Sequence, residues 1–133
     1  VVLVLIGKFA ALNALLEKSG AFPPVVTAPV LSRWSLTFLA WSSPYARPEG
    51  GTGAVFVGNI PPSSFALSTV FTAIIIAFTR ASASWLHWCV AFGVSIWIRR
   101  DSMKHISGIT GDVLGAACEM CTLAVLLTGA LMS

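Results

Sequence analysis

Charged side chains are scarce in this chain. Lys, Arg, Asp and Glu make up 10% of its 133 residues, hydrophobic residues make up 56%, and the mean hydropathy is +0.87. Soluble domains carry about 25% charged residues, so this scarcity excludes an ordinary soluble core. It predicts an all-α, polytopic membrane helical bundle embedded in a lipid bilayer. The net charge of +3 is small and dispersed, which argues against a nucleic-acid partner.

Cysteine is also rare, and none lies in a loop. Cys89, Cys118 and Cys121 all fall within apolar stretches, and an odd number so placed argues against a disulfide framework. Cys118 and Cys121 form a Cys-x-x-Cys pair, but no second pair and no suitably placed His completes a zinc site. We interpret all three as small apolar packing residues.

The chain has no initiating Met and begins with the apolar run 1–6. No basic region precedes this run and no small-residue cleavage site follows it, so it is not typical of a signal peptide. We expect the chain to begin inside a membrane helix, and residues 1–133 to form a single membrane domain that belongs to a larger bundle.

Five apolar stretches divide the chain: 1–16, 21–43, 65–79, 83–98 and 108–131. At 1.5 Å per residue the first is too short for a hydrocarbon core of about 30 Å. The third and fourth are expected to form a tight helical hairpin around residues 80–82. No internal repeat is visible and no second domain can be separated.

The basic residues of the loops predict an orientation. If all five stretches span the bilayer, the loops 44–64 and 99–107 lie on the same side. That side carries Arg47, Arg99, Arg100 and Lys104, and the other carries Lys18 and Arg80. The positive-inside rule therefore places the two loops in the cytoplasm.

Residues 108–119 place two carboxylates in the last apolar stretch. Asp112 and Glu119 are seven residues apart, almost two helical turns, so they lie in line on one face of a helix. An ionisable side chain in hydrocarbon costs roughly 2.5–3.5 kcal/mol or more and needs a partner, a metal or water. Thr110 is the expected N-cap, which puts Asp112 in the first turn, where it stays ionised and suits Mg²⁺. The alternative is a plain helix-terminal charge with a separately paired glutamate.

Two basic side chains also lie in apolar stretches and need partners there. Arg33 lies near the middle of the second stretch and Lys8 in the first. A guanidinium stays charged, so it must find an anion or water within the bundle. Arg33 is interpreted either as the partner of Asp112 or Glu119, or as a cation that binds phosphate. Because no nucleophile is paired with a base, any chemistry would rest on a metal and electrostatics.

Glycines mark two further features. Gly111-x-x-x-Gly115 has the spacing that lets membrane helices pack backbone to backbone. The loop 44–59 contains four glycines, whose exposed amides could hold phosphate oxygens, but it matches no nucleotide-binding spacing. A flexible connector is the alternative. The apolar residues 54–57 suggest that the loop folds back against the membrane.

Two motifs carry a family resemblance. The loop contains Tyr45-Ala46-Arg47-x-Glu49-Gly50 and then Val55-Phe56-Val57-Gly58-Asn59-Ile60, and the last stretch contains Gly108-x-Thr110-Gly111-Asp112-x-Leu114-Gly115-Ala116-x-x-Glu119. With Lys8 and Ser32-Arg33 upstream, the chain resembles cobalamin synthase, the adenosylcobinamide-GDP ribazoletransferase family, over nearly its whole length.

The resemblance implies a multi-pass enzyme of the bacterial or archaeal cytoplasmic membrane. That family transfers α-ribazole, or its 5′-phosphate, onto adenosylcobinamide-GDP with Mg²⁺ and releases GMP, in the last stage of cobalamin biosynthesis. It implies that Asp112 is catalytic and holds Mg²⁺, and that Glu119 is a further ligand or orients one. The substrate-binding residues that it implies are Lys8, Arg33, Arg47, Asn59 and Thr110, whose cations would meet the phosphates.

One departure from the family is clear. Its members are roughly twice as long and carry an aspartate-rich motif in the N-terminal half, whereas the aspartates here are Asp101 and Asp112. The chain therefore resembles the C-terminal half, and residues 1–133 alone are expected to be inactive. The sequence does not determine the oligomeric state, and a homo-oligomer is one alternative. The alternative from another class is a non-enzymatic membrane module, half a transporter or a structural subunit, with a buried Arg33–Asp112 pair.

Overall fold

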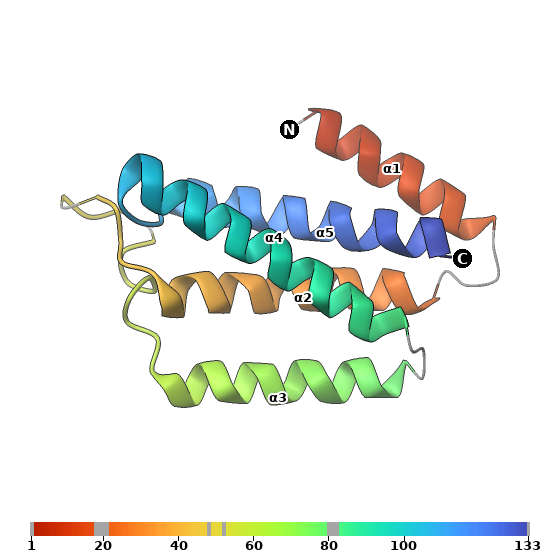
Figure 1. Ribbon diagram of the computed structural model, residues 1–133, viewed down its shortest axis with the longest axis horizontal. Coiled ribbons are helices and arrows are strands. Elements are labelled where there is room, and N and C mark those ends of the chain that lie inside the picture. Colours follow the sequence, from red (N-terminus) through yellow and green to blue (C-terminus); the bar gives the residue numbers. More distant parts are fainter. Residues whose placement is uncertain (1, 18–21, 48, 52, 80–82, 133) are drawn as a thin grey trace.

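The computed structural model describes residues 2–17, 22–47, 49–51, 53–79 and 83–132. Within these ranges the chain forms five α-helices and no strand (Figure 1). The helices are α1 (Val2–Leu16), α2 (Phe22–Ser42), α3 (Pro62–Phe78), α4 (Ala83–Ile106) and α5 (Gly111–Met132). The all-α prediction is confirmed, and each apolar stretch corresponds to one helix.

The largest difference from the expected boundaries is at the end of α4. The apolar stretch was expected to end at residue 98, but the helix continues to Ile106. Arg99, Arg100 and Asp101 interrupt the apolar run without breaking the helix, because arginine is a good helix former. The expected hairpin turn at residues 80–82 lies outside the described residues.

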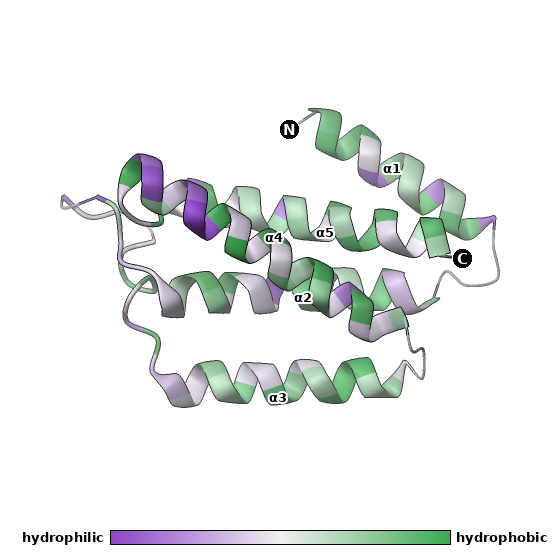
Figure 2. Cartoon of the chain, viewed as in Figure 1, coloured by the Kyte–Doolittle hydropathy of each residue, from purple (hydrophilic) through white to green (hydrophobic). Residues whose placement is uncertain are grey.

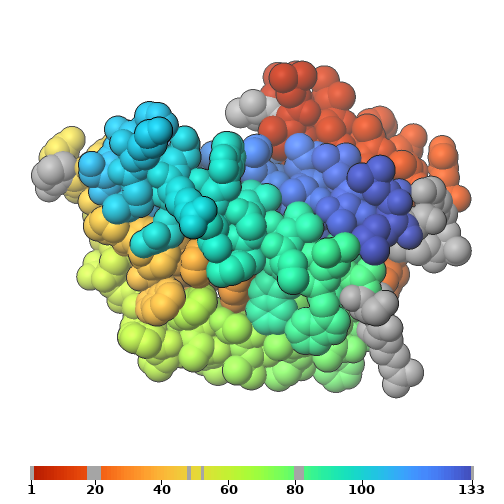
Figure 3. Space-filling model, in the orientation of Figure 1, coloured from red at the N-terminus to blue at the C-terminus, as the bar shows by residue number. Residues whose placement is uncertain are grey.

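Four helices lie side by side in the order α1, α5, α2, α3, and α4 crosses one face of them (Figures 1 and 3). Helix α5 packs against α1, α2 and α4, and helix α2 packs against α3, α4 and α5. Helix α1 diverges from α5 toward its N-terminal end (Figure 1). Where the two helices diverge, a cavity lies between Val4 of α1 and the N-terminal half of α5.

The buried apolar residues form two clusters. One joins all five helices and includes Leu15, Leu31, Ile76 and Val125. The other lies where α2 ends and α5 begins, and it is made of Leu39, Ala40, Val57, Ile98, Ile109 and Ala117. Because Val57 belongs to a loop and Ile109 to the α4–α5 turn, the second cluster anchors both of these segments to the helices.

The outward faces of α1 and α3 are strongly apolar (Figure 2). Their exposed large side chains are Val2, Leu3, Leu5, Ile6, Phe9, Leu16, Leu67, Val70, Phe71, Ile74 and Phe78. Within the described part, α5 is long and apolar enough to cross a membrane, whereas α1 and α3 are apolar but shorter. Of the five expected membrane segments, length and composition thus identify one. Helix α2 contains Arg33 and several hydroxyl residues, and α4 ends in a charged turn (Figure 2), which lowers their hydropathy.

Candidate functional site

The loop after α2 and the turn before α5 are joined through their backbones. Tyr45 and Ile109 form an isolated parallel bridge. The amide of Ala46 donates to the Ile109 carbonyl at 3.0 Å, and the amide of Ile109 donates to the Pro44 carbonyl at 2.9 Å. A Cβ on Gly108 would lie 2.7 Å from the Pro44 oxygen, closer than real Cβ atoms come, so this approach requires glycine. The loop 43–61 and the turn 107–110 are therefore joined, and together they are called the loop–turn unit.

The glycine-containing part of the loop folds back onto the same unit. A Cβ on Gly53 would lie 3.2 Å from the backbone nitrogen of Gly111, so the loop passes close to the first turn of α5. Gly58 has a φ of +78° and donates its amide to the Ala40 carbonyl at 2.7 Å. Val57 is buried at 3% exposure, while Val55 and Phe56 are exposed. Val57 thus packs against the end of α2 and the start of α5, and the expected contact of this loop with the membrane stays a prediction.

Arg99 fixes the other end of this unit, a role that the sequence analysis missed. Its Nε and one terminal nitrogen both donate to the Ser42 carbonyl, at 3.1 and 2.8 Å. The Ser42 carbonyl belongs to the last turn of α2, where carbonyls lack helical partners and a cation is favoured by the helix dipole. Arg99 had been counted only as a charge of the predicted cytoplasmic side.

Thr110 caps α5, as expected. Its hydroxyl accepts from the Val113 amide at 3.4 Å and its carbonyl accepts from the Leu114 amide at 3.0 Å. Thr110 is buried, so its hydroxyl serves the helix end. Asp112 then lies in the first turn, as predicted, where the helix dipole favours its charge.

Arg47 lies beside Asp112. A terminal nitrogen of Arg47 is 3.3 Å from Asp112 Oδ2, and the two side chains are 53% and 87% exposed. A pair this exposed contributes roughly 0–1 kcal/mol. Asp112 therefore remains open to a further ligand at the point where the loop, the turn and α5 meet.

Glu119 is held by a different cation. Lys8 Nζ of α1 lies 2.6 Å from Glu119 Oε2, and the side chains are 18% and 50% exposed. Asp112 and Glu119 both line a cavity of about 460 Å³ between α1 and α5, as their spacing predicted. The other lining residues are Val4, Gly111, Gly115, Ala116 and Met120. Two carboxylates and otherwise mostly apolar residues thus line the same cavity.

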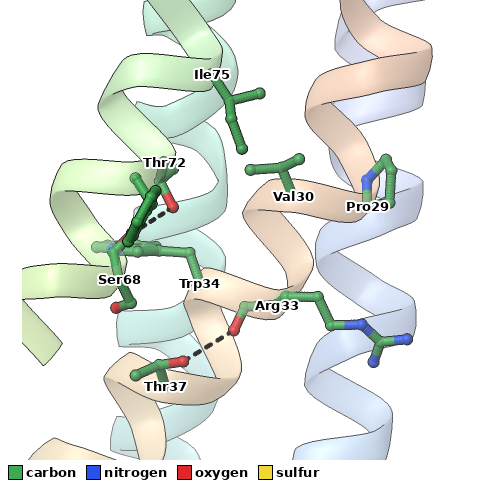
Figure 4. Close-up of a pocket in the computed structure, with 9 residues that line it drawn as sticks. Pro29, Val30, Arg33, Trp34, Thr37, Ser68, Thr72 and Ile75 are labelled. Carbon is green, nitrogen blue, oxygen red and sulfur yellow. Dashed lines mark hydrogen bonds between the residues drawn. The ribbon is translucent and has the colours of Figure 1, made fainter. Parts of the chain in front are cut away.

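Arg33 extends from α2 toward α5 (Figure 4). Its terminal nitrogen lies 3.5 Å from Cys118 Sγ, and sulfur is a weak acceptor. Among the described residues Arg33 forms no ion pair, because Asp112 pairs with Arg47 and Glu119 with Lys8. The interpretation of Arg33 as a partner of either carboxylate is therefore wrong for this structure, and so is the buried Arg33–Asp112 pair of the membrane-module alternative.

The stem of Arg33 also borders a groove of about 400 Å³ between α2 and α3 (Figure 4). Its other lining residues are Pro29, Val30, Trp34, Thr37, Ser68, Phe71, Thr72 and Ile75. The guanidinium points away from this groove (Figure 4). The positive charge of Arg33 is therefore directed toward α5.

Asn59 supports the shape of the loop. Its side-chain amide donates to the carbonyls of Ala54 and Val55, at 3.2 and 3.3 Å. Like Thr110, it uses its polar group within the loop–turn unit. Lys8 and Glu119 meet on the α1–α5 side, and Arg47 and Asp112 at the loop.

The donor set suits a hard divalent cation only in part. Within the described residues, no group of three or more His, Cys, Asp or Glu side chains gathers in one place. Asp112 and Glu119 supply oxygen ligands of the kind that Mg²⁺ prefers, but Mg²⁺ takes about six. Seven residues of helix separate their backbones by about 10.5 Å along the axis. Asp112, the more exposed of the two, fits as one ligand of an ion whose other ligands come from water, substrate or another segment.

Comparison with known proteins identifies relatives over nearly the whole chain. The family model described as cobalamin-5-phosphate synthase matches residues 1–130. An adenosylcobinamide-GDP ribazoletransferase of Pseudomonas syringae pv. syringae is 37% identical over 134 residues, which cover 98% of this chain and 53% of the relative. Another, from Syntrophobacter fumaroxidans, is 32% identical over 94% of this chain and 50% of its own length. A third, from Chlorobium phaeovibrioides, is 39% identical over 84% of this chain and 46% of its own length.

The chain thus spans about half the length of the curated relatives that it matches. No solved structure matches it.

Proposed function

From the premise that this chain belongs to the cobalamin-5-phosphate synthase family, we propose that it provides the C-terminal half of a membrane-bound adenosylcobinamide-GDP ribazoletransferase. The curated relatives that carry this name are about twice as long as the part that this chain matches. On this proposal the whole enzyme acts, and residues 1–133 contribute one wall of its active site.

The reaction joins an alcohol to an activated phosphate. A hydroxyl oxygen of α-ribazole, or of its 5′-phosphate, attacks the phosphorus that joins cobinamide to GMP. A phosphodiester forms, the bond from that phosphorus to the GMP oxygen breaks so that GMP leaves, and the hydroxyl proton passes to water. Mg²⁺, when bound, supplies charge neutralisation at the phosphate oxygens. The chain contributes binding, orientation and fixed positive charge.

The contact between Arg47 and Asp112 at the start of α5 carries the proposal. It places a carboxylate suited to Mg²⁺ next to a guanidinium suited to phosphate, on two segments that the Tyr45–Ile109 backbone bridge joins. The pair is exposed, so separating it costs little. A nucleoside diphosphate group with its metal can therefore displace the contact between Arg47 and Asp112. Arg47 then binds phosphate oxygens and Asp112 binds the metal.

The remaining predicted residues have supporting roles on this proposal. Arg33, which no carboxylate neutralises among the described residues, is a second phosphate-binding cation deeper along α5. Lys8 lies beside the cavity and balances the charge of Glu119. Glu119 lines the cavity and can still orient a metal-bound group. Asn59 and Thr110 hold the loop and the helix start in the shape that presents Arg47 and Asp112.

We also propose that the helices span the cytoplasmic membrane, with the loop–turn unit in the cytoplasm. The described basic residues outside the apolar stretches gather at this end, namely Arg47, Arg99, Arg100 and Lys104 (Figure 2). The positive-inside rule favours that side as cytoplasmic. Lys18 and Arg80, counted for the opposite side, lie outside the described residues.

The test compares Arg47→Met with Arg100→Met in the full-length protein, by the rate of GMP release as a function of adenosylcobinamide-GDP concentration. Arg47→Met should reduce kcat/KM by roughly tenfold or more, because a charge-assisted contact to phosphate is lost. Arg100, exposed on the same end of the molecule, should tolerate the change. Equal effects of the two substitutions would contradict a specific role for Arg47.

A further inference from the structure

The N-terminal half of α5 has an exposed side that lines the cavity beside α1. Its exposed residues, at helical spacing, are Asp112, Gly115, Ala116, Glu119 and Met120. We call this the α5 open face. The outward sides of α1 and α3, by contrast, carry large aliphatic and aromatic side chains. In a bilayer those two helices suit lipid. Asp112 and Glu119 are 87% and 50% exposed even with Arg47 and Lys8 as partners, and carboxylates exposed to this degree do not suit lipid. The α5 open face is therefore a surface that protein or water covers.

Gly115 leaves room for close contact there. A Cβ added to Gly115 would meet no atom within 4 Å, so nothing within the described chain requires a glycine at this point. Gly7 differs, because its Cβ would lie 3.0 Å from Leu123. Helical glycine costs roughly 1 kcal/mol relative to alanine, and its usual compensation in a membrane helix is the close approach of another helix.

The lengths of the relatives identify what approaches. The part that this chain matches makes up about half of each of three ribazoletransferases, so the whole protein proposed above contains a comparable length of sequence that can pack against it. Helix α4 already covers the other side of α5, and α3 presents a lipid-suited surface. The α5 open face, whose five residues all line the cavity between α1 and α5, is a polar surface available for that packing.

We infer that the α5 open face is the docking surface for the unmatched half of the full-length family protein, and that a membrane helix of that half crosses α5 at Gly115. This contact closes the cavity between α1 and α5 and places Asp112 and Glu119 at the junction of the two halves. The inference rests on the proposed function only in that the whole enzyme contains both halves. Docking can be measured without any activity.

The first experiment is photo-crosslinking in membranes. This chain is co-expressed with the unmatched half of the Pseudomonas syringae relative, with a photo-reactive amino acid at Met120 or, as the control, at Trp97. Met120 lies on the α5 open face, and Trp97 is exposed on α4. Crosslinking to the other half from position 120 and not from 97 is expected. A crosslink to a second copy of this chain, or to lipid alone, would overturn the inference.

The second experiment uses two matched glycines. Gly93 of α4 is exposed and its Cβ would also meet nothing within 4 Å, but its exposed neighbours Cys89, Phe92 and Trp97 carry no charge. Gly115→Leu should reduce co-purification of the two halves by roughly tenfold, because a bulky side chain separates the helices. Gly93→Leu should leave it unchanged. Equal behaviour of the two variants would refute docking at Gly115, and docking without GMP release would count against the proposed function alone.

Discussion

Lys8 Nζ and Glu119 Oε2 lie 2.6 Å apart, although 111 positions separate the residues in the chain. The contact joins α1 to α5 beside the cavity and balances the charge of both residues. It explains how two ionisable groups are accommodated in apolar helices, since each supplies the partner that the other needs.

The Lys8–Glu119 contact predicts coupled effects on stability. Lys8→Met and Glu119→Gln should each lower the free energy of unfolding, while the double variant should lose less than the sum, with a coupling of about 1 kcal/mol for a pair in which one group is half exposed. Thermal unfolding in a mild detergent measures this cycle. Strictly additive losses would show that the two residues act independently.

Replacing Gly108 should disturb the close backbone contact between the turn before α5 and the loop after α2. In Gly108→Ala the new methyl group would lie within 3 Å of the Pro44 oxygen and of Ala46 backbone atoms. These are backbone atoms that cannot move aside alone, so we expect a loss of about 1–3 kcal/mol. Gly93→Ala, where space is open, should be neutral or stabilising. Melting temperatures of the two variants decide the matter, and an unchanged value for Gly108→Ala would contradict the close approach described here.

Replacing Arg99 should lower the stability of the protein, whereas replacing its neighbour Arg100 should not. Arg99→Met removes two hydrogen bonds to the Ser42 carbonyl and should destabilise the protein by about 1–2 kcal/mol. Arg99→Lys should not fully restore stability, because an ammonium cannot reproduce the planar two-nitrogen contact. Arg100→Met is the control, since Arg100 is the exposed neighbour. If Arg100→Met destabilises equally, the effect is one of net charge.

Residues 1–133 alone should not catalyse the transfer. Asp112 and Glu119 are the carboxylates of the cavity, and two carboxylates do not complete the oxygen shell of Mg²⁺. Purified chain, incubated with both substrates and Mg²⁺, should release no GMP above background, and addition of the unmatched half should restore release. Activity from the purified chain by itself would contradict this expectation.

The helices were predictable because their signals are local. Apolar runs located all five, and the cap at Thr110 with Asp112 in the first turn followed from side-chain chemistry within a few residues. The end of α4 was not predictable from hydropathy, since Arg99 and Arg100 end an apolar run without ending a helix.

The charge pairings could not be predicted in the same way. Arg47 and Asp112 are 65 positions apart, and several cations could have reached either carboxylate on sequence grounds alone. Which pairs form depends on how α1 and α2 pack around α5, and this packing left Arg33 beside Cys118. The resemblance of two motifs pointed to the site region, whereas the backbone bridge that joins them required the structure.

The most direct test of the account is Asp112→Asn, compared with Asp101→Asn, in the full-length protein. Both aspartates are exposed and each pairs with a cationic or titratable neighbour, but only Asp112 lies at the junction of loop, turn and α5. The account predicts that Asp112→Asn abolishes Mg²⁺-dependent GMP release with an unchanged melting temperature, and that Asp101→Asn retains activity. Full activity of Asp112→Asn, or loss of activity through unfolding alone, would contradict the assignment of Asp112 to the active site.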